Sequence, residues 1–452
     1  MSGIWVQVVQ FILALSLLII LHEGGHFFFA RLFKTRVEKF YLFFDFLFPF
    51  SNILPFSLFK KKIGETEWGI GWFPLGGYVK IAGMVDESMD KEQLARPPEP
   101  WEFRSKKAWQ RLLIMLGGII VNVILAFLIY AMILFVWGQQ RLPLSEMKQG
   151  IMLTDTALAR QLGFRNGDKI VSVDNKKLRY FDEVMPEMLY ARTVVIERDG
   201  AKQTLTLPED WIGNLSKRGI FTYSFPAIVG EVAPHSGAAQ AGLQKKDRLT
   251  AINGVATPSF VAFSDAVKQY KSQTVPLTVV REGKELTVPV KVSDTGTIGF
   301  KPGGDLEDLE KMGLVKLVTR KYGFFEAFPA GVKLGIDNIK GYWRQLGLIL
   351  NFKNGAYKQT GGFISMANIY GKVWDWERFW SITAMISIAL AIMNLLPIPG
   401  LDGGYVVFTL IEMITGRKVN EKVLEVATTI GLVLLLCLML LVNGNDVFKL
   451  FK

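Results

Sequence analysis

The sequence contains little cysteine and little histidine. Cys437 is the single cysteine among 452 residues, so the chain cannot form an internal disulfide, and its folded parts depend on packing alone. Three histidines occur, and two of them, His22 and His26, stand four residues apart. With so few imidazoles in the chain, this pair singles out its segment for closer attention.

A nucleic-acid-binding surface is also missing from the sequence. The net charge is +11, yet no basic stripe with interleaved aromatic residues is present. The basic residues gather instead beside apolar segments, where anionic lipid headgroups attract them. We therefore expect a lipid bilayer, and no nucleic acid, among the partners of this protein.

Long hydrophobic runs are what the sequence does have. Half of its residues are hydrophobic and the mean hydropathy is +0.27. Four segments lack formal charge, and they are Ile4–Leu21, Leu112–Gly138, Phe379–Leu401 and Val426–Val442. The middle two are long enough to cross a bilayer, whereas the last is at the short limit and the first needs the His22 segment to reach normal length. We predict about four transmembrane helices.

The flanks of these runs predict an orientation. No Lys or Arg precedes the first run and no small-residue cleavage site follows it, so we do not expect a cleaved signal peptide. Basic residues instead occupy the connections between spans one and two and between spans three and four, at Arg31, Lys34, Arg36, Lys39, Arg104, Lys106, Lys107, Arg111, Arg417, Lys418 and Lys422. By the positive-inside rule both connections are cytoplasmic, which places the large middle region outside.

The segment His22-Glu23-Gly24-Gly25-His26 closes the first apolar run. On a helix, residues four apart share a face, so both imidazoles can bind one ion, with Glu23 placed to take a proton from the metal-bound water. Gly24 and Gly25 each cost roughly 1 kcal/mol in a helix and would leave space for another backbone or for substrate. Two ordinary core histidines are the alternative, which the desolvation cost of buried polar groups disfavours.

A catalytic zinc needs a third protein ligand. Glu38, Glu65 and Glu67 are available downstream, but they lie in a basic or aromatic loop. Asp402 is the better candidate, because it ends an apolar run that Pro397 and Pro399 interrupt. A helix-capping role for Asp402 is the alternative, although the apolar sequence continues after it. The ligand types favour Zn2+, and a depth of about 27 Å along the first helix places it toward the cytoplasmic leaflet.

The connection after the first span is rich in aromatic residues. Residues 40–59 are dense in Phe, and the sequence from Trp68 to Lys80 predicts a hairpin of short strands. We expect this region to dip into the bilayer, where its backbone must be covered by protein or face water. An interfacial loop held by its aromatic side chains is the alternative.

The middle region contains an internal repeat. Residues 159–170 return as residues 238–249, with Gly163 matching Gly242 and Asp168 matching Asp247. Each copy predicts a short helix, a turn, a strand, a second helix and a hairpin. The hairpins are expected to turn at residues 199–200 and 282–283.

The two copies resemble PDZ domains. The second is the clearer, with residues 234–243, 247–249 and 252–254 followed by the glycine-bearing segment that contains Gly299 and Phe300. The resemblance implies a circularly permuted PDZ fold, with Gly299 and Phe300 at a groove that takes peptide C-termini by adding a strand to a sheet edge. A packed spacer with an unused groove is the alternative for each copy.

The chain resembles the site-2 protease family, peptidase family M50. Three features carry the resemblance: the HExxH segment in a first span, the Asn394–Gly404 segment in a third, and the PDZ-like copies. The resemblance covers almost the whole chain. It implies a zinc ion held by His22, His26 and Asp402, with catalytic Glu23. It further implies that substrate is bound by Asn394, Pro397, Pro399 and by the strand-like residues Gly69, Ile70 and Gly71.

The family resemblance also supplies expectations about fold, partners and location. We expect a polytopic α-helical membrane protein with a membrane-associated β-hairpin region and two tandem PDZ-like α+β domains. The substrates would be single-span membrane proteins resembling anti-sigma factors, and also remnant signal peptides. The location would be the bacterial inner membrane, with the PDZ region periplasmic. Two departures from the family pattern are Gly118-Ile119 before Asn122, and Gly362-Phe363, where glycine-proline pairs are usual.

The predicted organisation has eight parts: 1–35 with the first span, 36–110 with the hairpin region, 111–139 as span two, 140–225 and 226–304 as PDZ-like domains, 305–375 as an amphipathic connection, 376–415 with span three, and 416–452 with span four. Two other functions fit parts of the pattern. One is a metal transporter using His22, His26 and Asp402 as an ion path, and the other is a catalytically silent membrane adaptor acting through its PDZ-like copies.

Overall fold

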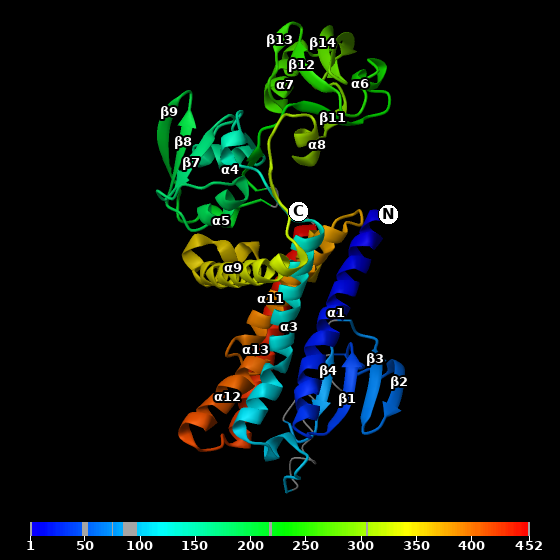
Figure 1. Ribbon diagram of the computed structural model, residues 1–452, viewed down its shortest axis with the longest axis vertical. Coiled ribbons are helices and arrows are strands. Elements are labelled where there is room, and N and C mark those ends of the chain that lie inside the picture. Colours follow the sequence, from blue (N-terminus) through cyan, green and yellow to red (C-terminus); the bar gives the residue numbers. More distant parts are fainter. Residues whose placement is uncertain are drawn as a thin grey trace. The chain divides into compact units, whose positions relative to one another are not determined.

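The structure is a computed structural model, and it describes residues 2–47, 53–74, 76–84, 97–216, 219–303 and 306–450. The chain divides into two compact units (Figure 1). Unit 1 contains residues 1–138, 321–347 and 360–452, and unit 2 contains residues 139–320 and 348–359. The two units are described separately below.

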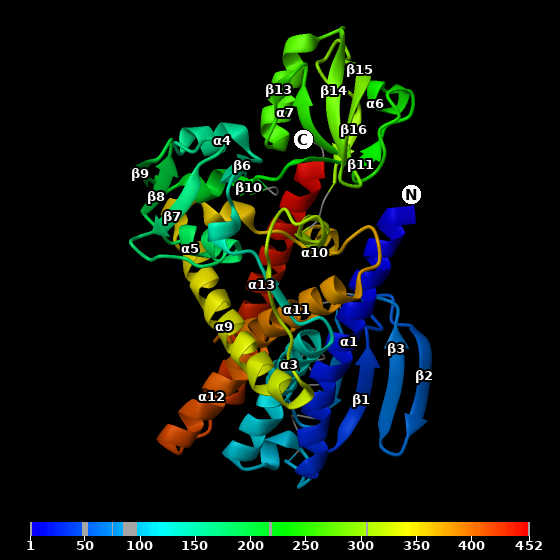
Figure 2. The same cartoon turned by 45° about the horizontal axis from the view of Figure 1, so that its top comes forward.

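Unit 1 is built on long apolar helices. Among the described residues, four helices are long and apolar enough to cross a membrane, namely α1 (Ser2–Leu32), α3 (Ala108–Val136), α11 (Trp376–Leu395) and α13 (Glu421–Leu450). This confirms the predicted number of spans. Helix α13 exposes Leu434, Leu438 and Leu441, a surface that suits lipid and not water. The start of α1 and the end of α13 lie at the same end of the unit (Figures 1 and 2), as four alternating spans require.

A four-stranded sheet follows the first helix. Its strands are β1 (Val37–Leu42), β2 (Ser57–Ile63), β3 (Thr66–Gly71) and β4 (Tyr78–Ile81), in the order β2-β3-β1-β4. The predicted hairpin between Trp68 and Lys80 is therefore wrong, because β3 and β4 do not pair but lie on either side of β1. Gly69, Ile70 and Gly71, which the family resemblance assigns to substrate binding, lie on β3, an interior strand that is hydrogen-bonded on both sides.

One turn and one contact between strands explain this strand order. Gly64 adopts a φ of +64°, which closes a tight turn, so the hairpin of the sheet is β2–β3. The missing side chain of Gly69 makes room for the ring of Tyr41 on β1, because a Cβ there would lie 2.3 Å from Tyr41 Cε1. Strand β3 thus packs tightly against β1, in parallel, and excludes β4 from its side.

The described part of unit 1 contains three further α-helices. They are α9 (Phe324–Leu350), whose first 24 residues belong to this unit, α10 (Phe363–Ile369) and α12 (Asp402–Thr415). Helix α9 approaches α3 closely, because a Cβ on Gly331 would meet the backbone of Ala131 at 2.5 Å. Helix α11 ends at Leu395 and a short loop leads to α12, so the predicted span-three segment 376–415 breaks into two helices at its prolines.

Unit 2 contains the repeat. The elements of the first copy are β6 (Ile151–Leu153), α4 (Thr156–Gln161), β7 (Lys169–Val173), α5 (Val184–Met188), β8 (Thr193–Arg198), β9 (Ala201–Thr206) and β10 (Phe221–Tyr223). The elements of the second are β11 (Ala227–Val232), α6 (Gly237–Gln240), β12 (Arg248–Ile252), β13 (Val255–Ala256), α7 (Phe260–Val267), β14 (Thr274–Arg281), β15 (Lys284–Lys291) and β16 (Phe300–Pro302). The order of helix, strand, helix and hairpin is confirmed in both copies. Strands β5 (Gln139–Arg141) and β17 (Val318–Arg320) pair with each other, and α8 (Leu306–Lys311) lies between β16 and β17 in the chain.

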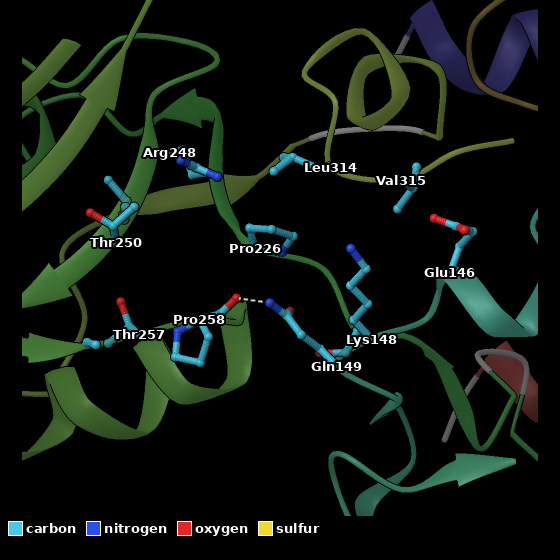
Figure 3. A pocket seen from close by; sticks show the side chains of 13 residues that line it. Glu146, Lys148, Gln149, Pro226, Arg248, Thr250, Thr257, Pro258, Leu314 and Val315 are labelled. Carbon is cyan, nitrogen blue, oxygen red and sulfur yellow. Dashed lines mark hydrogen bonds between the residues drawn. The ribbon is translucent and has the colours of Figure 1, made fainter. Parts of the chain in front are cut away.

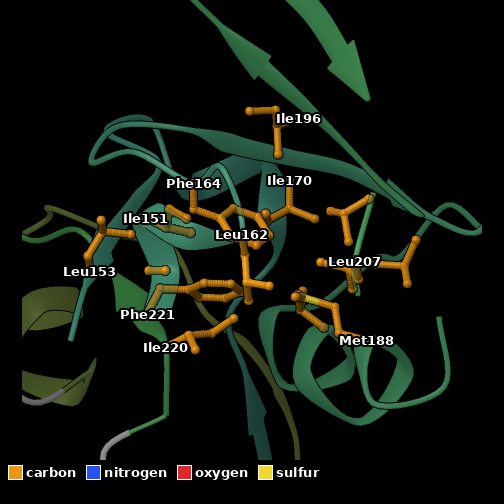
Figure 4. Packing of buried hydrophobic residues seen from close by; sticks show 14 of the residues in the cluster. Ile151, Leu153, Leu162, Phe164, Ile170, Met188, Ile196, Leu207, Ile220 and Phe221 are labelled. Atoms are coloured by element: carbon orange, nitrogen blue, oxygen red, sulfur yellow. The ribbon is translucent and has the colours of Figure 1, made fainter. Parts of the chain in front are cut away.

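Each copy encloses its own hydrophobic core. Figure 4 shows the core of the first copy, where Phe164, Ile196 and Ile220 are completely buried. The core of the second copy forms around Leu277, Ile252 and Val292, which are equally buried. Both hairpins turn where predicted: Asp199 and Glu282 have φ values of 52° and 50°, and a glycine with positive φ follows each. Two consecutive residues with positive φ indicate a type I′ turn, which matches the twist of paired strands.

The matched aspartates make the same contacts in the two copies. Asp168 pairs with Arg198 at 2.7 Å, and Asp247 pairs with Arg281 at 2.6 Å. Each arginine also donates to the carbonyl of the matched glycine, Gly163 in the first copy or Gly242 in the second. The repeat in the sequence therefore encodes one buried ion pair, used twice, that joins the first turn of each copy to its hairpin.

Candidate metal centre

Three predicted ligands meet inside unit 1. His22 and His26 lie on α1, and Asp402 is the first residue of α12. Asp402 Oδ2 lies 3.2 Å from His22 Nε2 and 3.3 Å from His26 Nε2, and the two Nε2 atoms are 3.3 Å apart. Among the described residues, this is the group of three His, Cys or acidic side chains close enough to hold a metal ion.

The geometry fits zinc. Bonds of about 2.0–2.1 Å in a tetrahedral site place neighbouring donor atoms about 3.3–3.4 Å apart, close to the three observed distances. Asp402 Oδ2 is buried and accepts no hydrogen bond within the described part of the chain. A buried carboxylate oxygen without a donor is costly unless a cation neutralises it. Two imidazoles and this carboxylate therefore form a donor set that zinc would satisfy.

Helix α3 packs closely against α1 and forms one side of the metal site. A Cβ on Gly25 would lie 2.2 Å from Gly117 O, so the two helix backbones touch at these glycines. A Cβ on Gly118 would lie 2.5 Å from both His22 Cε1 and His26 Nε2. Small residues let membrane helices approach in this way. The expected use of Gly25, to admit another backbone, is confirmed, whereas a Cβ on Gly24 would meet nothing within 4 Å.

Helix α3 also contacts the far side of both imidazoles. His26 Nδ1 lies 2.8 Å from the carbonyl oxygen of Ile114, and His22 Nδ1 lies 3.2 Å from the side-chain amide of Asn122. Asn122 is completely buried, and its own carbonyl accepts a hydrogen bond from Ser387 of α11. Each imidazole thus contacts α3 through its Nδ1 atom, while its Nε2 atom lies toward Asp402.

The loop between α11 and α12 positions Asp402. Gly400 has a φ of +95°, which reverses the chain between the two helices. A Cβ on Gly403 would lie 2.1 Å from Leu396 O, so α12 starts in direct contact with the end of α11. At the other end of α12, Glu412 forms an ion pair with Arg111 of α3. The position of Asp402 is therefore fixed by a turn that requires Gly400 and Gly403, and by the ion pair between Glu412 and Arg111 of α3.

Asn394, Pro397 and Pro399 surround this turn. Asn394 Nδ2 lies 3.2 Å from His22 Nε2, at the edge of the candidate metal site. Pro397 and Pro399 belong to the loop itself, and a Cβ on Gly431 of α13 would collide with Pro399 O. The structure thus brings Asn394 beside the ligands and places both prolines in the loop that precedes Asp402.

The three glutamates considered as third ligands lie elsewhere. Glu65 pairs with Arg31, Glu67 accepts a hydrogen bond from the Tyr41 hydroxyl, and Glu38 pairs with Lys80. Glu23, in contrast, is partly buried directly after His22 on α1. The choice of Asp402 over the downstream glutamates matches the arrangement of side chains in the structure.

The sheet touches α1 close to the histidines. A Cβ on Gly77, just before β4, would lie 2.6 Å from the side chain of Ile19, which is one helical turn before His22. Strand β4 is an edge strand of the described sheet, and Figure 1 shows it beside α1. The predicted residues Gly69, Ile70 and Gly71 lie two strands further away, on β3.

The predicted peptide-binding residues lie in unit 2. Gly299 has a φ of +83°, and a Cβ there would collide with Ser236. Phe300 starts β16, and its ring packs against Phe260 and Phe263 of α7. The two residues therefore lie where β16 and α7 face each other.

Unit 2 also contains a cavity of about 310 Å³ that the sequence analysis did not identify (Figure 3). Glu146, Lys148 and Arg248 bring charges of both signs to its wall, and Gln149 donates a hydrogen bond across it to the carbonyl of Pro258. Gly299 and Phe300 are not part of its lining.

Gly117, Gly118 and Asn122 were not predicted as site residues. A signal for them was present: after the polar first turn of α3, the two adjacent glycines and the Asn122 amide stand out in a strongly apolar sequence. A small-residue pair in a span indicates close helix contact, and a polar residue in a span indicates a functional partner. The sequence does not show which helix the glycine pair faces. The contacts of Gly118 and Asn122 with the histidines could therefore not be predicted.

Comparison with known proteins identifies the class. Residues 10–438 match peptidase family M50, so the chain belongs to that family. A protein from Neisseria meningitidis serogroup A, named as a zinc metalloprotease, is 28% identical over 470 residues, covering 97% of this chain and 98% of the relative. The chain is a zinc-dependent protease, and its described residues include four helices long and apolar enough to cross a membrane.

Within the family, the chain resembles regulators of sigma-E protease. The regulator of sigma-E protease RseP of Escherichia coli K12 is 28% identical over 477 residues, and the regulator of sigma E protease of Haemophilus influenzae is 27% identical over 481 residues. Both alignments cover 100% of this chain and 100% of the relative. The likeness therefore extends over both units.

Proposed function

We propose that this protease cleaves transmembrane segments of single-span membrane proteins at a zinc site formed by His22, His26 and Asp402. The observation that carries the proposal is the meeting of two donors from α1, which is long enough to cross a membrane, with Asp402, which starts α12 just after the membrane-length helix α11. A site built into spans acts on bonds that a soluble protease cannot reach. Anti-sigma-factor-like proteins and remnant signal peptides are the substrate classes that the likeness to regulators of sigma-E protease favours.

The protein side of the reaction is assigned to a few residues. Zinc at this site supplies a Lewis acid that activates water and polarises the scissile carbonyl. Glu23 accepts the proton of the attacking water and delivers it to the leaving amine, the usual role of the glutamate in this helical motif. Asn394 lies beside the ligands and donates a hydrogen bond from its amide to unwound substrate, while Pro397 and Pro399 keep the neighbouring loop non-helical.

A helical substrate must unwind before its peptide bonds can be attacked. Backbone groups released in a membrane need new hydrogen-bond partners. Strand β4 offers a sheet edge that touches α1 one turn from His22. We assign the docking of the unwound substrate to this edge, as an added strand, with Gly69, Ile70 and Gly71 of β3 supporting the sheet from within.

The single cysteine allows a direct test of strand docking. In a Cys437→Ser background, Val79→Cys on β4 is expected to form a disulfide with a substrate that carries one cysteine near its cleavage site. Leu58→Cys on β2, the opposite edge of the sheet, is the matched control and should not crosslink. Crosslinking at Leu58 with none at Val79 would rule out docking on β4.

Unit 2 is proposed to control access. Its two copies have the order of elements expected of PDZ-like domains, and Phe300 faces α7 as a residue of a peptide groove would. We assign unit 2 to the periplasm, the metal site to the cytoplasmic half of the inner membrane, and the binding of trimmed peptide C-termini to Gly299 and Phe300. If deletion of residues 142–300 leaves cleavage of untrimmed substrate unchanged, the gating role is wrong.

The central test compares Glu23→Gln with the unsubstituted protein. Purified full-length protein is incubated with a single-span substrate, and both zinc content and cleavage are measured. We expect Glu23→Gln to keep its zinc and to lose cleavage by a factor of at least about 100, the scale of general acid–base catalysis. Retained cleavage contradicts the assignment of Glu23. A chain that binds zinc but cleaves no substrate in the unsubstituted form would favour the transporter or adaptor alternatives.

A further inference from the structure

Asn122 makes a contact that the proposed reaction does not use. Its side chain is completely buried in α3, and its amide lies 3.2 Å from His22 Nδ1. The other side-chain atom, Oδ1, is also buried and has no hydrogen-bond partner among the described residues. The nitrogen of the amide thus contacts the ring nitrogen that faces away from the metal site, whereas its oxygen has no hydrogen-bond partner in the described part of the chain.

The zinc site dictates which end should face the ring. A neutral imidazole carries one proton, and the nitrogen that coordinates a metal does not hold it. His22 Nε2 lies beside Asp402 Oδ2 and would be the atom that binds zinc. With zinc bound there, the single ring proton must lie on Nδ1, and Nδ1 then needs an acceptor. The two ends of an asparagine amide are assigned from their hydrogen bonds, and half a turn about the Cβ–Cγ bond exchanges them. That rotation places the unpartnered Oδ1 at the Nδ1 proton.

We propose that Asn122 is a positioning residue that accepts the Nδ1 proton of His22 and so holds the ring in its zinc-binding tautomer. His26 provides the parallel. Its Nδ1 lies 2.8 Å from Ile114 O, a backbone acceptor from the same helix. Helix α3 therefore supplies the outer partner of both histidines, once by its backbone and once by the Asn122 side chain. Outer partners of this kind fix ring orientation and raise metal affinity.

The neighbourhood of Asn122 keeps it in place. Ser387 of α11 donates a hydrogen bond to the Asn122 backbone carbonyl at 2.8 Å, and both residues are fully buried. This bond does not compete with the contact between Asn122 and His22, because it uses the main-chain carbonyl of Asn122 and not its side chain. Asn122 is thus fixed between α11 and α1, while its side chain stays available to His22.

The inference rests on the proposed zinc site, and the first experiment separates the two. Zinc affinity of the full-length protein is measured by competition with a chelator for the unsubstituted chain, Asn122→Asp and Asn122→Leu. Asn122→Asp retains an acceptor and should bind zinc with nearly unchanged affinity. Asn122→Leu lacks one and should lose about 10- to 100-fold. Thr383→Val is the packing control, because Thr383 is equally buried and its hydroxyl donates to Phe379 O in its own helix and not to a candidate zinc ligand, so zinc affinity should not change.

The second experiment reads the tautomer directly in unsubstituted protein, so it does not depend on whether a variant folds. The chain has three histidines, and 15N-labelled histidine therefore gives few NMR signals to assign. In the zinc-loaded protein, His22 should show a protonated Nδ1 and a metal-bound Nε2. Asn122→Asp should preserve this pattern.

The outcomes are distinct. If the unsubstituted chain binds no zinc, the proposed metal site itself is wrong. If it binds zinc and Asn122→Leu binds zinc equally well, or if His22 coordinates through Nδ1, the role of Asn122 is wrong while the metal site stands. Loss of affinity in Asn122→Leu and in Thr383→Val alike would also overturn the inference, since it would indicate general damage to packing.

Discussion

Gly118 and His26 lie in contact with no room for one further carbon atom. A Cβ on Gly118 of α3 would stand 2.5 Å from His26 Nε2, well inside van der Waals contact. Gly118 therefore lines the metal site on the side of α3, although it offers no ligand atom.

Gly118→Ala should weaken zinc binding. The added methyl group must displace the imidazole of His26 or push α3 away from α1, and we expect zinc affinity to fall by about tenfold or more, as for other changes just outside the ligands. Chelator competition on purified protein measures this. Gly444→Ala on α13 is the matched control, because a Cβ there meets nothing within 4 Å. Equal zinc affinity in the two variants would contradict the role of Gly118.

Gly25→Ala should destabilise the contact between α1 and α3. A Cβ on Gly25 would lie 2.2 Å from Gly117 O, a backbone atom that cannot move aside alone. Overpacking of this kind costs about 1–3 kcal/mol. Thermal unfolding in detergent is the measurement, and Gly347→Ala in α9, where the Cβ meets nothing, should be neutral or stabilising. An unchanged melting temperature for Gly25→Ala would show that the helices separate more easily than their packing indicates.

How far the sequence determines this site can be judged residue by residue. His22, His26 and Asp402 were predictable, because imidazoles and a carboxylate in apolar runs need a reason to be there. Gly118 and Asn122 were not, because their roles depend on which face of α3 meets α1, and α3 is apolar nearly all round. An all-round apolar helix gives no periodic signal for its orientation.

The sheet shows the same limit. The sequence predicts short strands only between Trp68 and Lys80, and it predicts the wrong pairing, because strand pairing depends on contacts across the sheet. The ring of Tyr41 over Gly69 draws β3 to β1, and no local pattern encodes that contact. The repeat in unit 2, in contrast, was predictable in detail, because its turn residues Asp199 and Glu282 and their glycines act locally.

Arg198→Ala should destabilise the first copy of unit 2 strongly. Arg198 covers Asp168, whose side chain is 0% exposed, and removing one partner of a buried pair costs about 3 kcal/mol or more. Hydrogen exchange of the full-length protein, followed by mass spectrometry, should show faster exchange in β7 and β8. Lys301→Ala, which removes an exposed pair with Glu231, is the control and should leave hydrogen exchange nearly unchanged, because solvent screens such a pair. Equal exchange in both variants would show that the Asp168 pair contributes little.

Zinc analysis of Asp402→Asn tests the central claim most directly. The full-length unsubstituted protein should hold about one zinc per chain, as a catalytic site with three protein ligands predicts. Asp402→Asn should lose most of that zinc together with cleavage of a single-span substrate. Asp375→Asn, which changes the capping aspartate at the other end of α11, should retain both. A full zinc complement and normal cleavage in Asp402→Asn would contradict a metal site shared between α1 and α12.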